Sequence, residues 1–488
     1  MAIRKQIILN IRRDDVRVAL RENDELIQFY IERGDSLTSV GNIIKGKIIS
    51  RREELNAVFV DIGYDTLGFL SLSDLFYSMP DKKGNEVGTK LLVQVRKEPY
   101  GTKGARLTTF IAIPGRYLVL LPLRKTIGIS RNIKNRQERK RLRDIAREIC
   151  PVGMGLIIRT LASGKDVNTL KSDFLELKKI WENIKKKSKT ESSPSVLWED
   201  EELPIRITRD LLDDSVSEFV VDSKDAYKKI KGYLGRKNSL LLDRVKLYEK
   251  SVPIFSHYGI EQEILSIFRR KVWLKSGGYI IIDRTEALTV FDVNSGKYRG
   301  KKDTEDMIYK TNHEAAIEIA RQLRLRDIGG IIIIDFIDMR DKDNERKLIE
   351  KFKSCLSRDK ARFRVVLKLS PNGLLEMTRE RVRRSVTKRF VEPCPYCQGK
   401  GHVLSPPYLF SKFTSWLERE GRALDNARVR IIANPRVAYY FETEGGKTLE
   451  HSCFVNNMYI EIVKKEDQPI ELVRVLTYKN GEIITEEI

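Results

Sequence analysis

The sequence predicts a multidomain protein of mixed α/β and α+β class. Its 488 residues exceed what one hydrophobic core accommodates, so several domains are expected. Residues 40–112 carry many short runs of strand-forming residues separated by turn signals, which is typical of a small β-barrel. Residues 287–339 read as strand, glycine- and lysine-rich loop, helix and strand, which is typical of an α/β domain.

The chain is strongly basic. Lysine and arginine number 91 against 69 acidic residues, a formal net charge of +22, which favours a polyanionic partner such as nucleic acid. A solubility charge or attraction to anionic lipid is the alternative, but no amphipathic basic helix or lipidation motif argues for a membrane. The N-terminus has no signal-peptide apolar region, and the longest apolar runs have the length of a strand. Five cysteines do not make a disulfide framework in so long a chain, so we expect a cytoplasmic protein without membrane attachment.

The N-terminal 39 residues contain three strand-like runs, Gln6–Ile11, Val16–Leu20 and Gln28–Ile31. Three strands cannot close a core, so this segment must pack on a later part of the chain.

The barrel that follows resembles the OB-type RNA-binding domain. Phe59 lies on the opposite face of its strand from its valine neighbours, and Phe69 follows a glycine. On the outer surface of such a barrel, aromatic rings stack on bases and lysines meet phosphates. The alternative is that either phenylalanine belongs to the barrel interior.

Residues 113–205 combine a basic helix, Arg136–Ile149, with an arginine–hydroxyl pair. Arg159 and Thr160 end a strand and precede a glycine loop. An arginine fork with an adjacent hydroxyl can hold a terminal phosphate, although such pairs are common. A second helical stretch, Thr169–Ile184, runs into KKKSKTESSPS, which is polar and broken by proline and is predicted to be a mobile loop.

The stretch from Ala287 to Met339 carries the strongest signal. Its first strand, Ala287–Val293, presents Asp292 and Asn294 on one side, because side chains alternate along a strand. The helix is predicted to start at Asp303 or Thr304 and to end at a double glycine. The second strand, Ile331–Ile334, is apolar throughout and is therefore predicted to be buried on both faces, and it ends in Asp335. One apolar stripe on the helix comprises Ile308, Thr311, Ala315, Ile319 and Leu323.

Two apolar strands that each end in a carboxylate indicate a metal site. If the strands are neighbours, Asp292 and Asp335 converge at one edge of a sheet. Buried carboxylates need a cation or a hydrogen-bond partner, and oxygen ligands of this kind suit magnesium or manganese with water and phosphate in the remaining positions. The alternative is that the two aspartates cap the loops that follow their strands.

Beyond this stretch, we predict a charged helix in DKDNERKLIEKFKSCLSRDKAR, a strand in RFRVVLKLS, and a basic helix in SPNGLLEMTRERVRRSVTKRF. The basic helix could hold an RNA backbone or form a solvated face.

Cys394 and Cys397 have the spacing of one half of a zinc knuckle. The sequence holds no second CxxC, so the same pair from a second subunit could complete the tetrahedron, or the turn could be reduced and free of metal. Residues 404–488 are predicted to form a small α/β unit without chemistry of its own.

DVNSG, ARQLRLRDIGG and IIIIDFIDM together resemble the catalytic core of the ribonuclease E/G family, and the resemblance spans nearly the whole chain. The chain is most similar to the ribonuclease G branch, since it reads MTRER rather than MSRQR and no low-complexity tail follows. The resemblance implies an architecture of six parts: a split RNase H-like subdomain (1–39 and 206–268), an OB-type domain (40–112), a 5′-sensor domain (113–205), a DNase I-like catalytic subdomain (269–391), a zinc link (392–403) and a small C-terminal domain (404–488).

The same resemblance implies roles for individual residues. Asp292 and Asp335 would hold catalytic magnesium, and Asn294 would orient the scissile phosphate. Cys394 and Cys397 would share zinc between subunits of a homodimer or homotetramer. The 5′-monophosphate pocket would comprise Gly115, Val119, Arg159, Thr160 and Arg362, and the RNA contacts of the barrel would be Phe59, Phe69 and Lys103.

The implied function is magnesium-dependent endonucleolytic cleavage of single-stranded RNA, stimulated by a 5′ monophosphate and leaving 5′-phosphate and 3′-hydroxyl ends. Expected substrates are ribosomal RNA precursors and messenger RNA. A non-catalytic RNA-binding protein and a magnesium phosphodiesterase acting on DNA are the alternatives.

Overall fold

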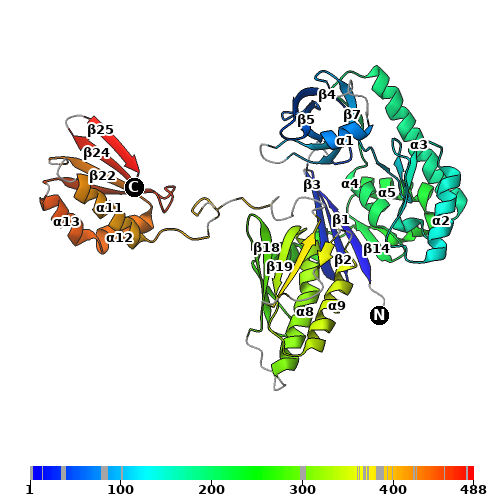
Figure 1. Ribbon diagram of the computed structural model, residues 1–488. Coiled ribbons are helices and arrows are strands. Elements are labelled where there is room, and N and C mark those ends of the chain that lie inside the picture. Colours follow the sequence, from blue (N-terminus) through cyan, green and yellow to red (C-terminus); the bar gives the residue numbers. More distant parts are fainter. Residues whose placement is uncertain are drawn as a thin grey trace. The chain divides into compact units, whose positions relative to one another are not determined.

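The chain forms two compact units, Met1–Arg389 and Phe390–Ile488, each with a hydrophobic core of its own (Figure 1). In both, the fold is a mixture of sheets and helices, as the sequence predicts. No helix in the part of the chain described here is long and apolar enough to cross a membrane. The computed structural model describes residues 4–13, 15–33, 40–78, 86–99, 103–296, 304–359, 361, 363–365, 370, 373–380, 390–392, 394–397, 399, 401–420, 424, 426–455, 457–479 and 482–487.

The N-terminal strands complete a sheet with a segment about two hundred residues away in the sequence. β1 pairs antiparallel with β2 and parallel with β14, so the three strands do pack on a later part of the chain. Helices α4 and α5 belong to the core on one face. On the other face α6 contacts β1, and its Phe255 meets Phe29 of β3 edge to face. The sheet order is β15 (Val245–Leu247), β14 (Val216–Val221), β1 (Lys5–Ile11), β2 (Asp15–Glu22), β3 (Glu25–Arg33), with α4 (Leu203–Leu211), α5 (Lys224–Lys237), η3 (Ser239–Arg244), α6 (Ile254–His257) and α7 (Ile260–Ser266) around it.

A closed five-stranded barrel follows, in agreement with the predicted small barrel. Its last strand, β7, pairs back with β4, so no edge remains open between them. β13 (Ser195–Trp198) adds to β4 from outside. The barrel strands are β4 (Ile43–Arg52), β5 (Ala57–Asp61), β6 (Gly68–Ser71), β8 (Arg106–Thr108) and β7 (Lys90–Lys97), with α1 (Leu72–Ser78) after β6.

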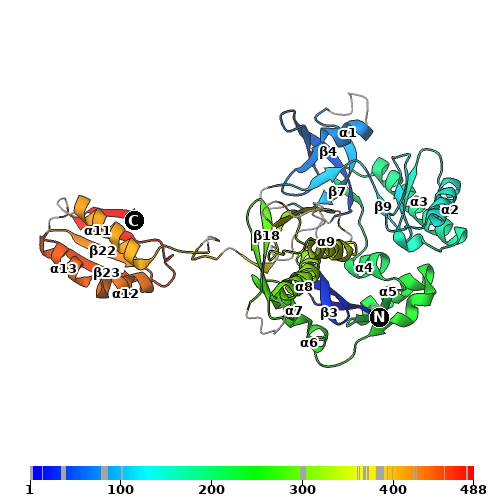
Figure 2. The same cartoon turned by 60° about the horizontal axis from the view of Figure 1, so that its bottom comes forward.

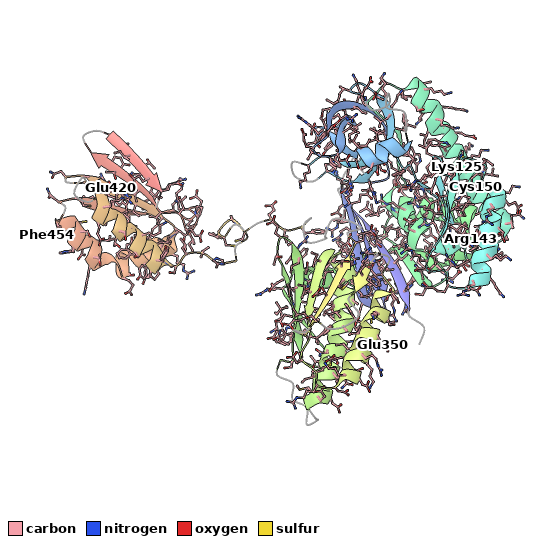
Figure 3. All side chains as sticks on the ribbon, in the orientation of Figure 1. Lys125, Arg143, Cys150, Glu350, Glu420 and Phe454 are labelled. Atoms are coloured by element: carbon pink, nitrogen blue, oxygen red, sulfur yellow. The ribbon has the colours of Figure 1, made fainter. Side chains whose placement is uncertain are left out.

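A four-stranded sheet covered by two helices lies next along the chain. α2 exposes Arg143, labelled in Figure 3, whereas Arg139 and Arg141 are half-buried and donate hydrogen bonds to the carbonyls of Ser130 and Lys165. α3 (Val167–Thr190) is longer than predicted, because it continues through the lysine-rich segment that we expected to be a loop. Lys45 donates hydrogen bonds of 2.7 Å to the carbonyls of Ser188 and Glu191, which satisfies acceptors at the helix end. The sheet order is β11 (Ile127–Ile129), β12 (Gly155–Ile158), β10 (Leu118–Leu121), β9 (Ile113–Pro114), with α2 (Arg136–Ile149) and η2 (Thr160–Ala162).

The sheet that carries the aspartates is covered by helices on one face (Figures 1 and 2). α8 and α9 bury the apolar stripe predicted for α8, and Ala315, Ile319 and Leu323 are fully buried. The sheet order is β16 (Lys271–Trp273), β17 (Tyr279–Arg284), β18 (Leu288–Asn294), β19 (Gly330–Asp335), β21 (Leu374–Arg379), β20 (Phe363–Val365), with α8 (Thr304–Leu325) and α9 (Lys342–Leu356).

Two predictions for this sheet are wrong. β19 is not buried on both faces: Ile331 is 51% exposed, because the described helices cover only the face of Ile332 and Ile334. We call the uncovered side the open face. Residues 374–379 form strand β21 and not the first turns of a helix, since their alternate side chains enter the core and their backbone pairs with β19. Arg379 is consequently buried and paired with Asp359.

The second unit is a small α/β domain, as predicted for residues 404–488. Its sheet is covered by helices whose apolar residues, such as Phe413 and Phe441, are fully buried. The order is β23 (Tyr459–Lys464), β22 (Arg428–Ala433), β24 (Arg474–Lys479), β25 (Glu482–Glu487), with α11 (Pro406–Glu420), α12 (Pro435–Thr443) and α13 (Gly446–Val455).

Candidate active site

Asp292 and Asp335 stand directly opposite each other on neighbouring strands. β18 and β19 run parallel, and the register pairs Asp292 with Asp335 at their carboxyl ends. Asn294, two residues further along β18, donates a hydrogen bond of 2.9 Å from its amide nitrogen Nδ2 to Asp292 Oδ2. The structure therefore brings the three predicted residues to one end of the open face.

The backbone around Asn294 is held by a close approach that only glycine permits. Gly296 has a φ of +61°, and a Cβ there would lie 2.4 Å from the carbonyl oxygen of Gly277. Gly278 approaches Asn294 in the same way, because a Cβ added at Gly278 would lie 2.8 Å from the carbonyl oxygen of Asn294. The end of β18 is thus packed against the β16–β17 turn, which fixes the position from which Asn294 projects.

The electrostatics of Asp335 are those of a site built for a cation. Burial, the charge of Asp292 and the charge of Asp338 together raise the pKa of Asp335 above its ordinary value. Sequence reasoning missed Asp338, although it follows Asp335 within the motif IIIIDFIDM. Its carboxylate lies beside Gly373, where a Cβ would be 2.9 Å from Asp338 Oδ1. Like charges gathered at one place favour the binding of a positive ion.

This donor set fits magnesium. Within the described residues no three histidine, cysteine, aspartate or glutamate side chains form a group that could hold a metal ion. Magnesium does not need such a cage, because it keeps several waters and binds through one or two carboxylates plus substrate phosphate. Asp292 and Asp335 would supply those two carboxylates, and the exposure of both leaves room for water and phosphate.

Arg159 is held in place by two bonds. Its guanidinium donates to the carbonyl of Gly115 at 2.6 Å and to Asp210 Oδ1 at 2.7 Å. A guanidinium has five N–H donors, so these bonds leave capacity for an anion. Thr160 shares a hydrogen bond of 2.8 Å between its hydroxyl and that of Ser130.

Asp210 has a role that the sequence did not suggest, because its DLLDD context resembles a turn. Burial would raise the pKa of Asp210, but the charges of Arg159 and Arg209 lower it below its ordinary value. Arg209 also pairs with the buried Asp200 at 2.7 Å. The resulting chain of charges orients Arg159 from a rigid base.

The other predicted phosphate ligands divide by position. Gly115 lies against Asp173, where a Cβ would come within 2.6 Å of Oδ2, so its lack of a side chain is a packing requirement. Val119 is half-buried in the middle of β10. Arg362 lies outside the described residues.

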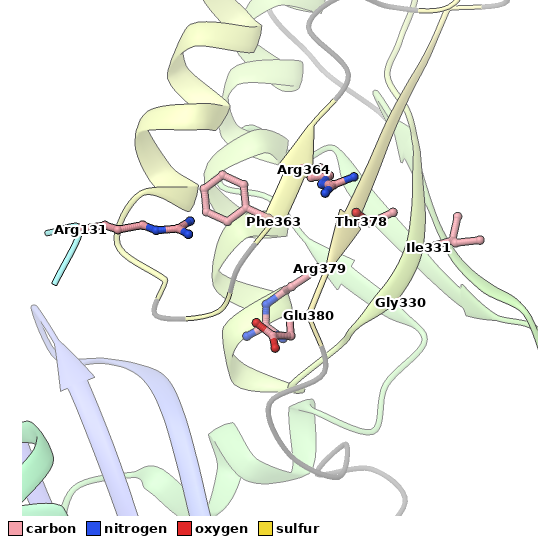
Figure 4. Close-up of a pocket in the computed structure, with 8 residues that line it drawn as sticks. All are labelled: Arg131, Gly330, Ile331, Phe363, Arg364, Thr378, Arg379 and Glu380. Carbon is pink, nitrogen blue, oxygen red and sulfur yellow. The ribbon is translucent and has the colours of Figure 1, made fainter. Parts of the chain in front are cut away.

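A cavity of about 650 Å³ lies between Arg131 and the β16-to-β20 sheet, at the start of β19 and the end of β21 (Figure 4). Arg131, the residue after Ser130, points toward Phe363 across it. Ile331 and Thr378 line it from β19 and β21, and Arg364 from β20. Two exposed arginines and the exposed Glu380 line this cavity, and Asp335 lies at the opposite end of β19.

The barrel presents its two predicted aromatic residues on the outside. Phe59 and Phe69 are cross-strand partners with ring centroids 6.0 Å apart in an edge-to-face arrangement, while Val58, Val60 and Leu70 fill the interior. The interior alternative is therefore wrong. Lys103 is exposed beside β6, since the adjacent Gly104 lies against the carbonyl of Leu67.

One further basic residue belongs to this face. Arg106 pairs in register with Phe69 and is exposed. Sequence reasoning missed it because strand register is invisible in one sequence. It adds a cation directly beside the two half-buried rings on the outside of the barrel, which suits a surface that binds RNA.

Cys394 and Cys397 lie in a turn near the start of the second unit. Hydrogen bonds from the backbone N–H groups of Gly401 and Gly399 lower the pKa of Cys397 below its ordinary value. N–H groups directed at sulfur favour the thiolate, which is the form that binds metal. Two thiolates fit one half of a tetrahedral zinc site, and the described residues add no third ligand.

Comparisons with known proteins identify the family. A model of the ribonuclease E/G family matches residues 112–382. Ribonuclease G of Salmonella typhimurium (strain SL1344) and of Escherichia coli (strain K12) are each 36% identical to the chain, over 95% of its length and 97% of theirs. The chain belongs to the ribonuclease E/G family. Ribonuclease E of Haemophilus influenzae is also 36% identical over 99% of the chain, but the match covers 53% of that longer protein.

The range matched by the family model includes both the carboxylate pair and the Arg159 region. The range 112–382 includes the pair Asp292 and Asp335 and also Arg159, and it ends before Cys394. The similarity to the two ribonuclease G proteins supports membership over nearly the whole chain as well.

We predict that magnesium stabilises the protein through Asp335. Binding to the folded state alone raises stability by about 2.7 kcal/mol when magnesium is at a hundred times its dissociation constant. Thermal melting with and without magnesium should show this shift in the wild type and in Asp343→Asn, an exposed control. It should be absent in Asp335→Asn.

The pH dependence has a definite sign. Because the folded-state pKa of Asp335 is raised, its contribution to stability is present at acid pH and is lost as the pH rises through that pKa. Without magnesium at neutral pH, Asp335→Asn should therefore melt above the wild type, and this difference should vanish in acid. If magnesium raised the melting temperature of the wild type and of Asp335→Asn equally, the ion would bind at another site.

Proposed function

We propose that this member of the ribonuclease E/G family is a magnesium-dependent endoribonuclease that cleaves single-stranded RNA. The observation that carries the proposal is the register pairing of Asp292 with Asp335, with Asn294 bonded to the first of them. A cation at the phosphorus oxygens accelerates the hydrolysis of a phosphodiester, and this pair is suited to hold one. The substrates we expect are ribosomal RNA precursors and messenger RNA, and the expected location is the cytoplasm.

The chemistry assigns one task to each residue. Asp292 and Asp335 would hold magnesium, which when bound activates water and neutralises charge on the phosphate. The Asn294 amide, oriented by Asp292, would position the scissile phosphate. The oxygen of water forms a bond to phosphorus and the bond from phosphorus to the 3′ oxygen breaks. The 3′ oxygen then takes a proton, so the products carry a 5′ phosphate and a 3′ hydroxyl.

The 5′ end of the RNA would be read at Arg159 and Thr160. Asp210 and the Gly115 carbonyl hold the arginine fork in one orientation, which lowers the entropy lost on binding a phosphate. The cavity between Arg131 and β20 would lead the strand onward to the carboxylates. Preference for a 5′ monophosphate then arises as a coupling between the two sites.

The remaining parts would support this reaction. The β15-to-β3 sheet would be the RNase H-like subdomain and the β16-to-β20 sheet the DNase I-like catalytic subdomain. The sheet with β10 would be the 5′ sensor. The barrel would hold RNA through Phe59, Phe69 and Lys103, and Cys394 with Cys397 would join two subunits through zinc.

The experiment that tests the proposal compares Asp292→Asn with the wild type on one short single-stranded RNA. We expect magnesium-dependent cleavage to fall by about a thousandfold, the factor equivalent to several kcal/mol of transition-state stabilisation, while RNA affinity persists. Asp343→Asn is the matched control. A wild type that binds RNA but never cuts it would favour the non-catalytic alternative, and a DNA strand of the same sequence cut equally fast would favour the DNA-directed alternative.

We predict that Arg159→Gln removes the preference for a 5′ monophosphate. Loss of a charge-assisted hydrogen bond should slow cleavage of 5′-monophosphorylated RNA by about tenfold and leave 5′-hydroxyl RNA unaffected. Arg147→Gln, an exposed residue of α2, is the control. An equal loss on both RNAs would mean that Arg159 serves the fold and not the sensor.

We also predict that zinc and the oligomer depend on the same two cysteines. The wild type should contain half as many zinc ions as chains, and the double variant Cys394→Ser with Cys397→Ser should contain none and sediment as a monomer. Cys453→Ser is the control, because this cysteine lies in the second unit away from the CxxC turn. An oligomer that survives loss of zinc would contradict the proposal.

A further inference from the structure

Three side chains form a cluster on the open face, at the edge of the sheet opposite to β20. Lys271 and Trp273 belong to the edge strand β16, and Tyr279 to the adjacent β17. The rings of Trp273 and Tyr279 meet edge to face, with centroids 5.4 Å apart. The ammonium nitrogen of Lys271 lies 4.0 Å from the first centroid and 3.6 Å from the second. We call these residues the Trp273 cluster.

The cluster shares its rows with the proposed active site. In register across the sheet, Lys271 is followed by Ile281, Asp292 and Asp335. The next row holds Trp273, Tyr279 and Asn294. Strands lie about 4.8 Å apart, so Lys271 and Asp292 are separated by roughly 10 Å. The alternate residues Val272, Ile280 and Val293 pack into the core, which places the cluster and the carboxylates on the same side.

Trp273 is too exposed for a residue whose function is packing. It is 64% exposed, although tryptophan is buried on average in folded proteins. The strand that carries it is three residues long and lies at the sheet edge. A lysine alone would protect such an edge from pairing with another chain, so edge protection does not account for two aromatic rings.

We propose that the Trp273 cluster is a nucleotide subsite, in which Trp273 stacks on an RNA base that flanks the scissile phosphate and Lys271 meets the adjoining phosphate. The inference rests on the proposed function and adds a substrate contact to it. Aromatic rings accept any base through its π face, and a lysine beside them attracts the backbone. Tyr279 supports Trp273 from the side and lies beside Asn294, so a stacked base and the reacting phosphate would be aligned by one rigid sheet.

An RNA base explains the arrangement better than a protein partner does. The cluster combines two aromatic rings with a cation. It lies roughly 10 Å from the carboxylates, which an RNA bound through magnesium would approach. The chain as a whole carries a charge of +22. A second copy of so basic a protein would bring further positive charge to Lys271, which is unfavourable.

The test combines a protein variant with a substrate variant. Trp273→Ala should raise the KM for a single-stranded RNA by about tenfold with little change in kcat, as expected for a contact made equally before and during the reaction. Trp273→Phe should restore most of the loss. Tyr439→Ala, which removes an equally exposed aromatic residue from the second unit, should have no effect.

Abasic nucleotides placed one at a time on either side of the cleaved bond give the decisive readout. In the wild type one of these positions should raise KM by about tenfold, and in Trp273→Ala the same abasic nucleotide should cost nothing further, because the stacking partner is already absent. Independent, multiplicative losses would overturn the proposal. So would self-association of the wild type that Trp273→Ala abolishes, since that outcome assigns the cluster to a protein interface.

A binding measurement separates this inference from the proposed function. In the Asp292→Asn background, the RNA should quench the part of the tryptophan fluorescence that Trp273→Phe removes. Quenching without any cleavage by the wild type would retain the subsite and reject the nuclease. Cleavage without quenching and without abasic sensitivity would retain the nuclease and reject the subsite.

Discussion

The parallel pairing of β18 with β19 is the constraint on which the rest of the site depends. A parallel pair requires a crossover connection, and α8 provides it. The helix buries Ala315, Ile319 and Leu323 against the sheet, and that burial opposes the repulsion between the carboxylates at the strand ends. Strand pairing and this packing together hold Asp292 beside Asp335 against the repulsion between their charges.

The one-sided coverage of this sheet has the largest functional consequence. Helices cover the face of Ile332 and Ile334, while the side chains of Ile331, Asp335 and Asp292 remain accessible on the other. The carboxylates lie at the carboxyl ends of the two central strands, and the Trp273 cluster lies beside them at the β16 edge. The Arg131 cavity lies at the opposite end of β19, toward β20. A strand of RNA could therefore lie across one rigid surface, with basic or aromatic contacts on both sides of the reacting phosphate.

Buried ion pairs give the surrounding groups fixed positions. Arg379 is buried with Asp359 and Asp327, and Arg209 with Asp200, so each pair needs its partner in place. The second network ends at Arg159 through Asp210. Preorganisation of this kind favours specificity for a phosphate, since the fork need not be ordered at the moment of binding.

Local patterns in the sequence were sufficient to predict elements whose bounds depend only on nearby residues. The bounds of α2 and the start of α8 agree with the prediction, because capping residues and an apolar stripe are local signals. Predictions failed for elements whose structure depends on contacts with a distant segment of the chain. Residues 374–379 contain helix-compatible residues but pair with β19, and the lysine-rich end of α3 is stabilised by Lys45 of the barrel. A one-sided sheet cannot be read from IIIID, because an all-apolar strand looks the same with one covered face or two.

The sequence by itself determined the family, the basic charge and the identity of the candidate ligands, since residue types and motif spacing are properties of the chain. Only the tertiary structure decided which of these residues meet. It placed Asp338 beside Asp335, gave Arg159 the partner Asp210, and set Trp273 in register with Asn294. The physical reason is that strand register and packing join residues far apart in the chain, and both follow from burial of the whole core.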